Sequence, residues 1–367
     1  MDTKISAKQK LLLKSVGESS VWGATSGGQY ISFASPSLNS SSGLGGVPRG
    51  KVTLLGGHPS AGKTMCSLDL IKSVEASGGS FLYFDSEYAY EEQWGINQGI
   101  KAPADEWVVR DNSLKSIWET LIGRPETWGK AKEDTGILGS KEWIEDENLQ
   151  LVVLDSLDSM VPPAQEGVEI GKQSMALKAR FLSAELPRLV EVAAKSNVAI
   201  VLVLQVRTNI GVMWGDPETV SGGKALMHAA SLFYNFKRVN KTEVMEGDNI
   251  VGHVVKFRVD KNKVGAPYKK GEFTIKYNEG ICDTDKELVK LAIDNDIFTR
   301  VNNQVWEFNF GDEPIRVRGE DNFIDTVMGN EAAVASLKEQ LCINPYICHL
   351  LSTLNINTGA RCNVVPW

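Results

Sequence analysis

Four short apolar runs recur between residues 51 and 206, and helical patterns separate them. The runs are KVTLLGG, GSFLYFDSE, LQLVVLDSL and VAIVLVLQV. Nearly unbroken apolar character is typical of strands that helices cover on both faces of a parallel sheet. The pattern therefore predicts an α/β core with these four strands inside the sheet.

The pattern changes twice within the rest of the core. Between the third and fourth runs, residues 174–197 have a helical period that places Leu177, Phe181 and Leu182 on one face. Pro187 is expected to kink or split this helix. From Phe233 to Tyr277, apolar and polar residues alternate, as in HVVKFRVDKNKV and EFTIKY. This alternation predicts antiparallel strands and therefore a mixed, mostly parallel central sheet.

The two ends of the chain have their own patterns. Residues 1–20 predict one helix, and residues 32–50 are rich in Ser, Gly and Pro, which predicts a loop. After Gly280 we expect a helix over 285–297, a hairpin around 305–310 and a helix over 331–341. The predicted units are an N-terminal helical arm with a linker (1–43), an α/β core (44–281), a small α+β C-terminal domain (282–345) and a tail (346–367).

Composition excludes several classes of protein. The chain has 367 residues, 42% of them hydrophobic and 23% charged, with five scattered cysteines and no CxxC pair. This excludes a disulfide framework and a zinc ribbon. No run approaches membrane-spanning length and the N-terminus lacks a signal peptide, so we expect a cytoplasmic protein with no membrane partner. The net charge of −7 does not exclude nucleic-acid binding, which needs only a local basic track.

A phosphate-binding motif follows the first apolar run and precedes a helical pattern. It fits G-x-x-x-x-G-K-[ST], in which backbone N–H groups surround phosphate oxygens, the lysine neutralises the terminal phosphates and the hydroxyl ligates Mg²⁺. A chance Gly-rich turn is the alternative, which the strand and helix on either side disfavour. The motif residues are Gly57, His58, Pro59, Ser60, Ala61, Gly62, Lys63 and Thr64.

Polar residues also follow the other strands. Asp155 ends the third run and has the position of a Walker B carboxylate beside Mg²⁺, with Ser156 next to it, although such an Asp is also a common helix cap. Glu87 and Asp85 at the end of the second run are both candidates for the general base, and spacing does not decide between them. Gln205 ends the fourth run before a long Gly-rich loop and is either a γ-phosphate sensor or a capping amide.

These residues belong to a collinear series of blocks that resembles the bacterial and phage RecA-type homologous recombinases. The blocks are GGVPRGKVTLLGGHPSAGKT, YFDSEYA, LVVLDSLDSMVP, IGVMWGDPETVSGGKAL and VDKNKVGAPYKKGEF…IKYNEGI, and they cover about residues 44–341. The resemblance implies a RecA-like P-loop ATPase core over residues 44–281 and a role in oligomerisation for the N-terminal arm (1–43). It also implies a DNA-dependent ATPase that forms helical filaments on single-stranded DNA and exchanges strands with homologous duplex DNA.

The resemblance implies roles for residues of the ATP site. It makes Glu87, rather than Asp85, the catalytic glutamate, and it makes Gln205 the link between the γ-phosphate and the second DNA-binding loop. Lys261 and Lys263 would reach the ATP of a neighbouring protomer as cations acting in trans. ATP and Mg²⁺ would be held by the eight motif residues together with Met65, Trp94 against the adenine, Asp155 and Ser156, with Thr64 and Asp155 as the metal ligands.

The resemblance also implies two DNA-binding loops, at about residues 165–178 and 206–223. Their backbone contacts would be Arg180, Arg207, Gly222 and Gly223, and the residues inserted between bases would be Met175 and Ile210. Backbone charge and apolar wedges suit sequence-independent binding. The chain departs from cellular members at Asn209, where a lysine is usual, and at Lys172 and Lys178, which add charge to the first loop. It also carries about twenty extra residues within 123–148, which predict a surface excursion.

Two other functions remain as alternatives. A hexameric replicative helicase shares the phosphate loop, the glutamate and the Walker B acid, but the Lys261 and Lys263 pair and the two-loop block oppose it. A non-filamentous regulatory ATPase of the same superfamily would bind protein partners instead of DNA. For a recombinase, single-strand-binding and mediator proteins are further partners consistent with the resemblance.

Overall fold

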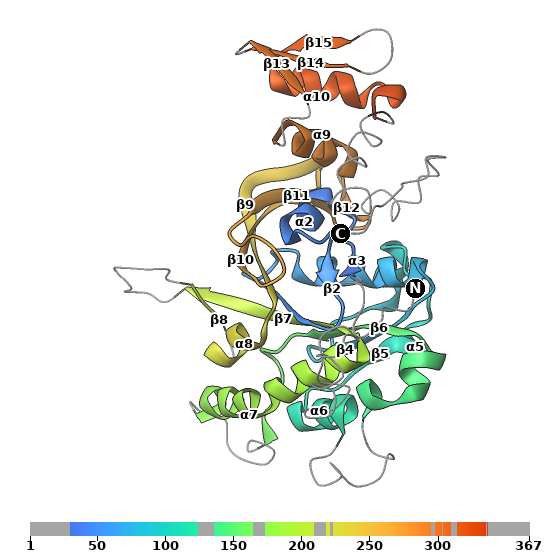
Figure 1. The fold of residues 1–367 in the computed structure, drawn as a ribbon, viewed down its shortest axis with the longest axis vertical. Coiled ribbons are helices and arrows are strands. Elements are labelled where there is room, and N and C mark those ends of the chain that lie inside the picture. Colours follow the sequence, from blue (N-terminus) through green and yellow to red (C-terminus); the bar gives the residue numbers. More distant parts are fainter. Residues whose placement is uncertain are drawn as a thin grey trace, which may run out of the picture.

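The computed structural model describes residues 30–123, 136–163, 173–208, 218–220, 223–294, 298–302, 304–309, 314–334 and 336. A mixed sheet forms the centre of this part of the chain (Figure 1). Its strand order is β12-β11-β10-β9-β3-β7-β6-β4-β5, and β8 pairs with the end of β7. The sheet confirms the predicted α/β core with its mixed, mostly parallel strands.

The parallel half contains the four predicted strands, β3 (Val52–Gly57), β4 (Ser80–Asp85), β6 (Leu149–Asp155) and β7 (Ala199–Thr208), with β5 (Val108–Val109) at its edge. The predicted antiparallel region is also confirmed. It consists of β9 (Leu232–Glu246), β10 (Asn249–Asn262), β11 (Lys270–Lys276) and β12 (Gly280–Cys282). β9 joins the two halves because it pairs with β3 in parallel and with β10 antiparallel. The carboxyl ends of β3, β4, β6 and β7 therefore meet at one edge of the sheet.

Helices cover both faces of the sheet (Figure 1). Helix α3 (Lys63–Ala76) packs with residues such as Leu55 in one hydrophobic cluster. Helices α6 (Leu114–Ile122) and α7 (Gln173–Ser196) pack with residues such as Leu54 in a second cluster. Neighbouring residues of one strand thus belong to opposite clusters, which explains why the core strands are apolar throughout.

Helix α7 corrects one expectation, because Pro187 lies inside a single helix of 24 residues instead of splitting it. Proline removes one backbone hydrogen bond. On the inner face of the helix, Leu182, Leu186 and Leu189 are at most 1% exposed. Burial of such side chains contributes about 1.5–3 kcal/mol each, which offsets the local cost of the proline.

The Ser- and Gly-rich segment before β3 also differs from the predicted loop. It contains helix α2 (Pro36–Ser42), which Ser35 caps by accepting the N–H of Leu38, and strands β1 (Tyr30–Ile31) and β2 (Val47–Pro48) pair on either side of it. Leu38 is fully buried in the cluster that contains α3. Proline at the first helical position and a serine cap were signals of a helix start that the composition hid.

The extra residues within 123–148 are only partly a surface excursion. Residues 124–135 lie outside the described residues. The following turns, η3 (Ile137–Gly139) and η4 (Glu142–Asp146), bring Leu138, Trp143 and Ile144 against the cluster of α6 and α7. Between β4 and β5 lie two short helices, α4 (Glu92–Asn97) and α5 (Ala104–Trp107).

The C-terminal region has a hydrophobic cluster of its own. The helix expected over 285–297 is α9 (Thr284–Asp294), and the expected hairpin is β13 (Thr299–Asn302) with β14 (Val305–Phe308). A third strand, β15 (Ile315–Arg318), and helix α10 (Glu320–Met328) were not predicted. Residues 331–334 and 336 are helical, and the rest of the helix expected over 331–341 lies outside the described residues. So do the predicted N-terminal helix and the tail.

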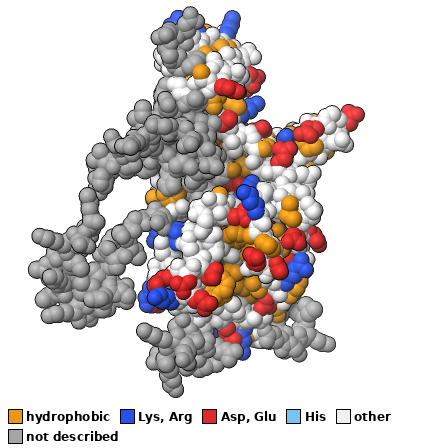
Figure 2. All heavy atoms as spheres, turned by 90° about the vertical axis from the view of Figure 1, so that its right-hand side faces the viewer, with side chains coloured by type: hydrophobic (Ala, Val, Ile, Leu, Met, Phe, Trp, Pro, Cys, Tyr) orange, Lys and Arg blue, Asp and Glu red, His pale blue; other side chains and the backbone are white. Residues whose placement is uncertain are grey.

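No described helix is long and apolar enough to cross a membrane. On the face that Figure 2 presents, acidic, basic and hydrophobic side chains are interspersed, and the described basic side chains form no continuous track.

Candidate active site

The phosphate-binding motif forms a tight loop between β3 and α3. Gly57 ends the strand, and Gly62 has a φ of +82°. A Cβ atom at Gly57 would lie 2.4 Å from the carbonyl oxygen of Phe236, and one at Gly62 would lie 2.4 Å from Cδ1 of Ile275, so both positions require glycine. Of the remaining motif residues, Pro59 and Ser60 are exposed, Ala61 is buried, and His58, Lys63, Thr64 and the adjacent Met65 are half-buried.

Lys63 points across the mouth of this loop. Its Nζ donates to the carbonyl oxygens of Gly57 at 3.2 Å and His58 at 2.9 Å. Burial lowers the pKa of Lys63, and the carboxylates of Asp155 and Glu87 oppose this shift. The lysine thus stands between the loop backbone and the acidic residues that follow β4 and β6.

Asp155 connects the loop to the strands. Its Oδ2 accepts hydrogen bonds from Thr64 Oγ1 at 2.8 Å and from the Tyr83 hydroxyl at 2.9 Å. Burial raises the pKa of Asp155 to about 6, and the two hydrogen bonds act in the opposite direction. A hydroxyl and a carboxylate oxygen therefore meet where the motif predicts the Mg²⁺ site. Tyr83 was missed because it lies within a continuous apolar run.

The residues present fit a bound Mg²⁺ ion. Thr64 and Asp155 both offer oxygen atoms, which hard divalent cations prefer. Among the described residues, no group of three or more His, Cys, Asp or Glu side chains could hold a metal.

The two acidic candidates after β4 have different surroundings. Asp85 is 2% exposed and accepts the backbone N–H groups of Ala89 at 3.2 Å and Tyr90 at 3.0 Å, so it stabilises the turn. Glu87 is exposed, and its Oε1 accepts the hydroxyl hydrogen of Ser156 at 2.5 Å. Of the two carboxylates, that of Glu87 is therefore the exposed one, and that of Asp85 is buried.

Two aromatic residues outside the motif, Trp94 and Tyr277, are connected by a hydrogen bond. Trp94, on α4, donates from its indole Nε1 to the carbonyl oxygen of Tyr277 at 3.4 Å, and Gln98 donates to the same oxygen at 3.0 Å. Tyr277 is 37% exposed and was not singled out from the sequence. It follows β11, which carries the Ile275 side chain that faces Gly62. The indole of Trp94 is thus held against the backbone of the residue that follows β11.

The ends of the two loops lie near the turn after β6. Gln205 and Arg207 belong to β7, which extends into the second loop and pairs there with β8 (Glu218–Val220). Arg180 is exposed on α7, and Gly223 is exposed at the start of α8 (Lys224–Ala229) with a φ of +80°. Several predicted residues lie wholly or by their side chain outside the described residues: Met175, Ile210, Gly222, Lys172 and Asn209.

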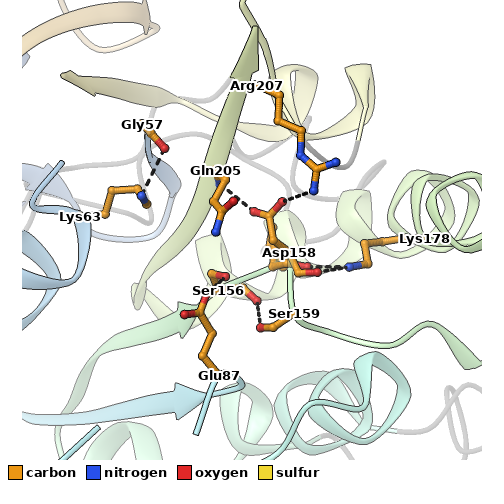
Figure 3. A network of polar contacts seen from close by, with 10 residues as sticks. Gly57, Lys63, Glu87, Ser156, Asp158, Ser159, Lys178, Gln205 and Arg207 are labelled. Atoms are coloured by element: carbon orange, nitrogen blue, oxygen red, sulfur yellow. Dashed lines mark hydrogen bonds and ion pairs between the residues drawn. The ribbon is translucent and has the colours of Figure 1, made fainter. Parts of the chain in front are cut away.

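Lys178, which is expected to add charge to the first loop, contacts the turn after β6. Its Nζ donates to the carbonyl oxygens of Leu157 at 2.9 Å and Asp158 at 2.8 Å, so it fixes the turn after β6 (Figure 3). The Asp158 carboxylate in turn accepts the backbone N–H of Gln205 at 2.6 Å. The sequence offered one weak signal for Asp158, its place three residues after the Walker B acid.

Lys261 and Lys263 lie at and just beyond the end of β10. Both ammonium groups face the C-terminal end of α8, where Lys261 donates to the Met227 carbonyl oxygen and Lys263 donates to that of His228 at 2.9 Å. Burial, together with the neighbouring Lys263, lowers the pKa of Lys261 to about 8. The two lysines therefore converge on one point of the surface.

The comparison with known families decides the identity of this arrangement. The model of the RecA N-terminal domain matches residues 12–282. The chain belongs to the RecA family. It is 31% identical over 317 residues to Protein RecA of Azoarcus sp. (strain BH72), covering 85% of this chain and 83% of that protein. Protein RecA of Chlorobium limicola is 33% identical over 311 residues, which cover 85% and 78% of the two chains.

Membership of the family settles the biochemical class. The protein is an ATP-binding, DNA-binding recombinase of recombination and repair, and its activity is that of a DNA-dependent ATPase that carries out strand exchange. The RecA-like core predicted from the motif blocks is confirmed, and so is the resemblance on which the prediction rested.

Proposed function

We propose that this RecA recombinase binds ATP with Mg²⁺ in the loop that follows β3 and uses it to control a filament on DNA. The observation that carries this proposal is the contact of Thr64 Oγ1 with Asp155 Oδ2 at 2.8 Å, which joins the phosphate loop to the Walker B strand. Lys63 is then placed to neutralise the terminal phosphates, and Trp94 with Tyr277 to contact the adenine. When bound, Mg²⁺ would neutralise phosphate charge at Thr64 and Asp155.

Glu87 is proposed as the general base. It lies after β4 at the edge where the strands' carboxyl ends meet, and the Ser156 hydroxyl fixes one of its oxygens. The other carboxylate oxygen can then accept a proton from an attacking water, a role that needs a carboxylate within hydrogen-bond reach of that water. Asp85 is committed to backbone N–H groups and is unsuited to this step.

The remaining roles concern DNA and the neighbouring protomer. Gln205 is proposed to sense the γ-phosphate. The proposed contacts to the DNA backbone are Arg180, Arg207, Gly222 and Gly223, and Met175 and Ile210 are proposed to insert between bases. Lys261 and Lys263 are proposed to act on the ATP of the next protomer, as trans cations do in other nucleotide hydrolases. Single-stranded and homologous duplex DNA are the proposed partners, with single-strand-binding and mediator proteins as accessories, and the cytoplasm is the proposed location.

The test compares ATP hydrolysis with and without single-stranded DNA and examines the same mixtures by electron microscopy. We expect DNA-stimulated hydrolysis and helical filaments. In the Glu87→Gln variant, filaments with ATP should persist while hydrolysis falls by at least 100-fold, within the usual contribution of general base catalysis. Glu106→Gln, an exposed glutamate on α5, is the matched control and should behave as the unaltered protein.

Two outcomes would contradict the proposal. Stimulated hydrolysis without any filament would favour a helicase-like or regulatory ATPase. A Glu87→Gln variant that no longer binds ATP would show that Glu87 has a binding role rather than a catalytic one.

A further inference from the structure

One carboxylate touches two parts of β7 that the proposed function assigns to different ligands. Asp158 Oδ2 accepts the backbone N–H of Gln205 at 2.6 Å, and its Oδ1 lies 4.0 Å from a guanidinium nitrogen of Arg207 (Figure 3). The Asp158 side chain is 9% exposed, whereas that of Arg207 is 60% exposed. A group that is accessible to DNA is thus paired with a sheltered charge beside the phosphate sensor.

The backbone of Asp158 is held independently of its side chain. Lys178 reaches from α7 and donates to the carbonyl oxygens of Leu157 and Asp158. The N–H of Leu157 donates to the Val203 carbonyl oxygen at 2.9 Å, which fixes the turn to β7. A change in the partners of the Asp158 carboxylate can therefore move its side chain and the end of β7 without displacing the turn.

The same turn begins at the ATP site. Its first residues are Asp155, which contacts Thr64, and Ser156, which contacts Glu87. Ser159 donates to the Ser156 carbonyl oxygen at 2.8 Å, so the two ends of the turn are connected. From the proposed metal ligand to Arg207, the path runs through hydrogen-bonded or ion-paired groups over a few residues.

We propose that Asp158 is a positioning residue that transmits DNA binding at Arg207 to Gln205 and so couples the DNA and ATP sites. The proposal rests on the proposed function, which places Arg207 on DNA and Gln205 at the γ-phosphate. A DNA phosphate competes with the Asp158 carboxylate for the Arg207 guanidinium. Because the two charged groups are 4.0 Å apart and the Arg207 side chain is 60% exposed, their attraction is weak and the phosphate can displace the carboxylate.

When a DNA phosphate displaces the Asp158 carboxylate from Arg207, the hydrogen bond at Gln205 also changes. Without the nearby positive charge of Arg207, the Asp158 carboxylate depends more strongly on the Gln205 N–H, since hydrogen bonds to a charged acceptor are stronger than neutral ones. The end of β7 then follows the carboxylate, and the position of the Gln205 amide changes. Thermodynamic linkage makes the effect reciprocal. The factor by which DNA changes the affinity for ATP equals the factor by which ATP changes the affinity for DNA.

The experiment measures this factor at equilibrium. The dissociation constant for a fluorescent oligothymidylate is determined with and without a nonhydrolysable ATP analogue, and the ratio of the two is the coupling factor. Asp158→Asn keeps an oxygen that can accept the Gln205 N–H but removes the charge. We expect its coupling factor to fall at least fivefold, the lower end of typical coupling. Its affinity without nucleotide should be unchanged or up to about fivefold tighter, because competition for Arg207 is lost.

Three further variants sharpen the test. Asp248→Asn alters an exposed carboxylate in the turn between β9 and β10 and should leave the coupling factor unchanged. Lys178→Met keeps the aliphatic part of the side chain but removes both hydrogen bonds, so it should also lower the factor. In an Arg207→Gln background, Asp158→Asn should lower the factor no further, because the two residues act in one path.

The outcomes separate this inference from the proposed function. A coupling factor near one in the unaltered protein would overturn both. If the unaltered protein shows coupling and neither Asp158→Asn nor Lys178→Met changes the coupling factor, only the role of Asp158 is overturned. An equal loss of DNA affinity with and without the analogue would assign Asp158 a purely structural role and would also overturn the proposal. If the Asp158→Asn variant does not fold, the coupling factor of Lys178→Met decides whether the proposal holds.

Discussion

Glu287 should make the stability of the protein depend on pH in a way that a single substitution removes. This residue of α9 is 7% exposed, and its Oε2 accepts the Ser35 hydroxyl hydrogen at 2.6 Å and the Ser37 N–H at 2.8 Å. Its Oε1 has no hydrogen-bond partner among the described residues. Burial, which outweighs the two hydrogen bonds, and the nearby Asp69 carboxylate raise the pKa of Glu287 from 4.5 to about 7.

The direction of the pH dependence follows from the pKa of Glu287 in the folded and unfolded states. Because the folded pKa is higher, the folded state binds the proton more tightly, and the free energy of unfolding falls as pH rises from about 4.5 to about 7. One pKa unit corresponds to about 1.4 kcal/mol, so the full loss is about 3 kcal/mol. Glu287→Gln has no charge to bury and should lack this loss. Relative to the unaltered protein, the variant should therefore gain about 3 kcal/mol between pH 4.5 and pH 8.

Urea unfolding followed by tryptophan fluorescence across this pH range, without DNA or nucleotide, measures the difference. Glu106→Gln on the exposed α5 is the control, and its difference from the unaltered protein should not vary with pH. Asp69→Asn provides an independent check, because removing this neighbouring charge should lower the pKa of Glu287 and reduce the pH dependence. A Glu287→Gln difference that stays constant from pH 4.5 to pH 8 would refute the reasoning.

Two further predictions concern the ATP site. Tyr83→Phe removes a hydrogen bond that stabilises the Asp155 carboxylate, so the pKa of Asp155 should rise further above about 6 and the acidic limb of the pH–rate profile of ATP hydrolysis should move to higher pH. An unchanged profile would exclude a role for the charge of Asp155. The double variant Lys261→Ala with Lys263→Ala should bind ATP but lose DNA-dependent hydrolysis, whereas Lys256→Ala, an exposed lysine elsewhere on β10, should retain it. Normal turnover in the double variant would rule out action in trans.

The parts of the fold that the sequence predicted are those in which local pattern and burial agree. β3, β4, β6 and β7 are apolar because both faces are covered, and this pattern is visible without any tertiary information. Pro187 and α2 were misjudged because their local signals were overridden or hidden. The leucines of α7 stabilise a helix through its proline, and a serine cap starts α2 within a segment that otherwise has the composition of a loop.

The site was predictable to the extent that its residues form contiguous motifs. The phosphate loop and Asp155 follow strands in a fixed order, and the structure brings them into contact. Tyr83, Tyr277 and Asp158 were missed because their roles depend on neighbours distant in sequence. Their hydrogen bonds reach Asp155, Trp94 and Gln205 across the edge of the sheet, and no spacing within one segment encodes such contacts.

The residues near the predicted DNA loops show that a count of charged residues is a poor guide to DNA binding. Lys178 increases the positive charge of the first loop in the sequence, yet its ammonium group donates hydrogen bonds to the carbonyl oxygens of Leu157 and Asp158. Asp158 supplies the opposite charge at the same turn and faces Arg207. Arg180 is exposed, and the salt dependence of DNA binding should include its contribution. In the proposed coupling, the Asp158 carboxylate links Arg207 to Gln205 along β7, so Asp158→Asn should change the coupling factor more than the affinity for DNA without nucleotide.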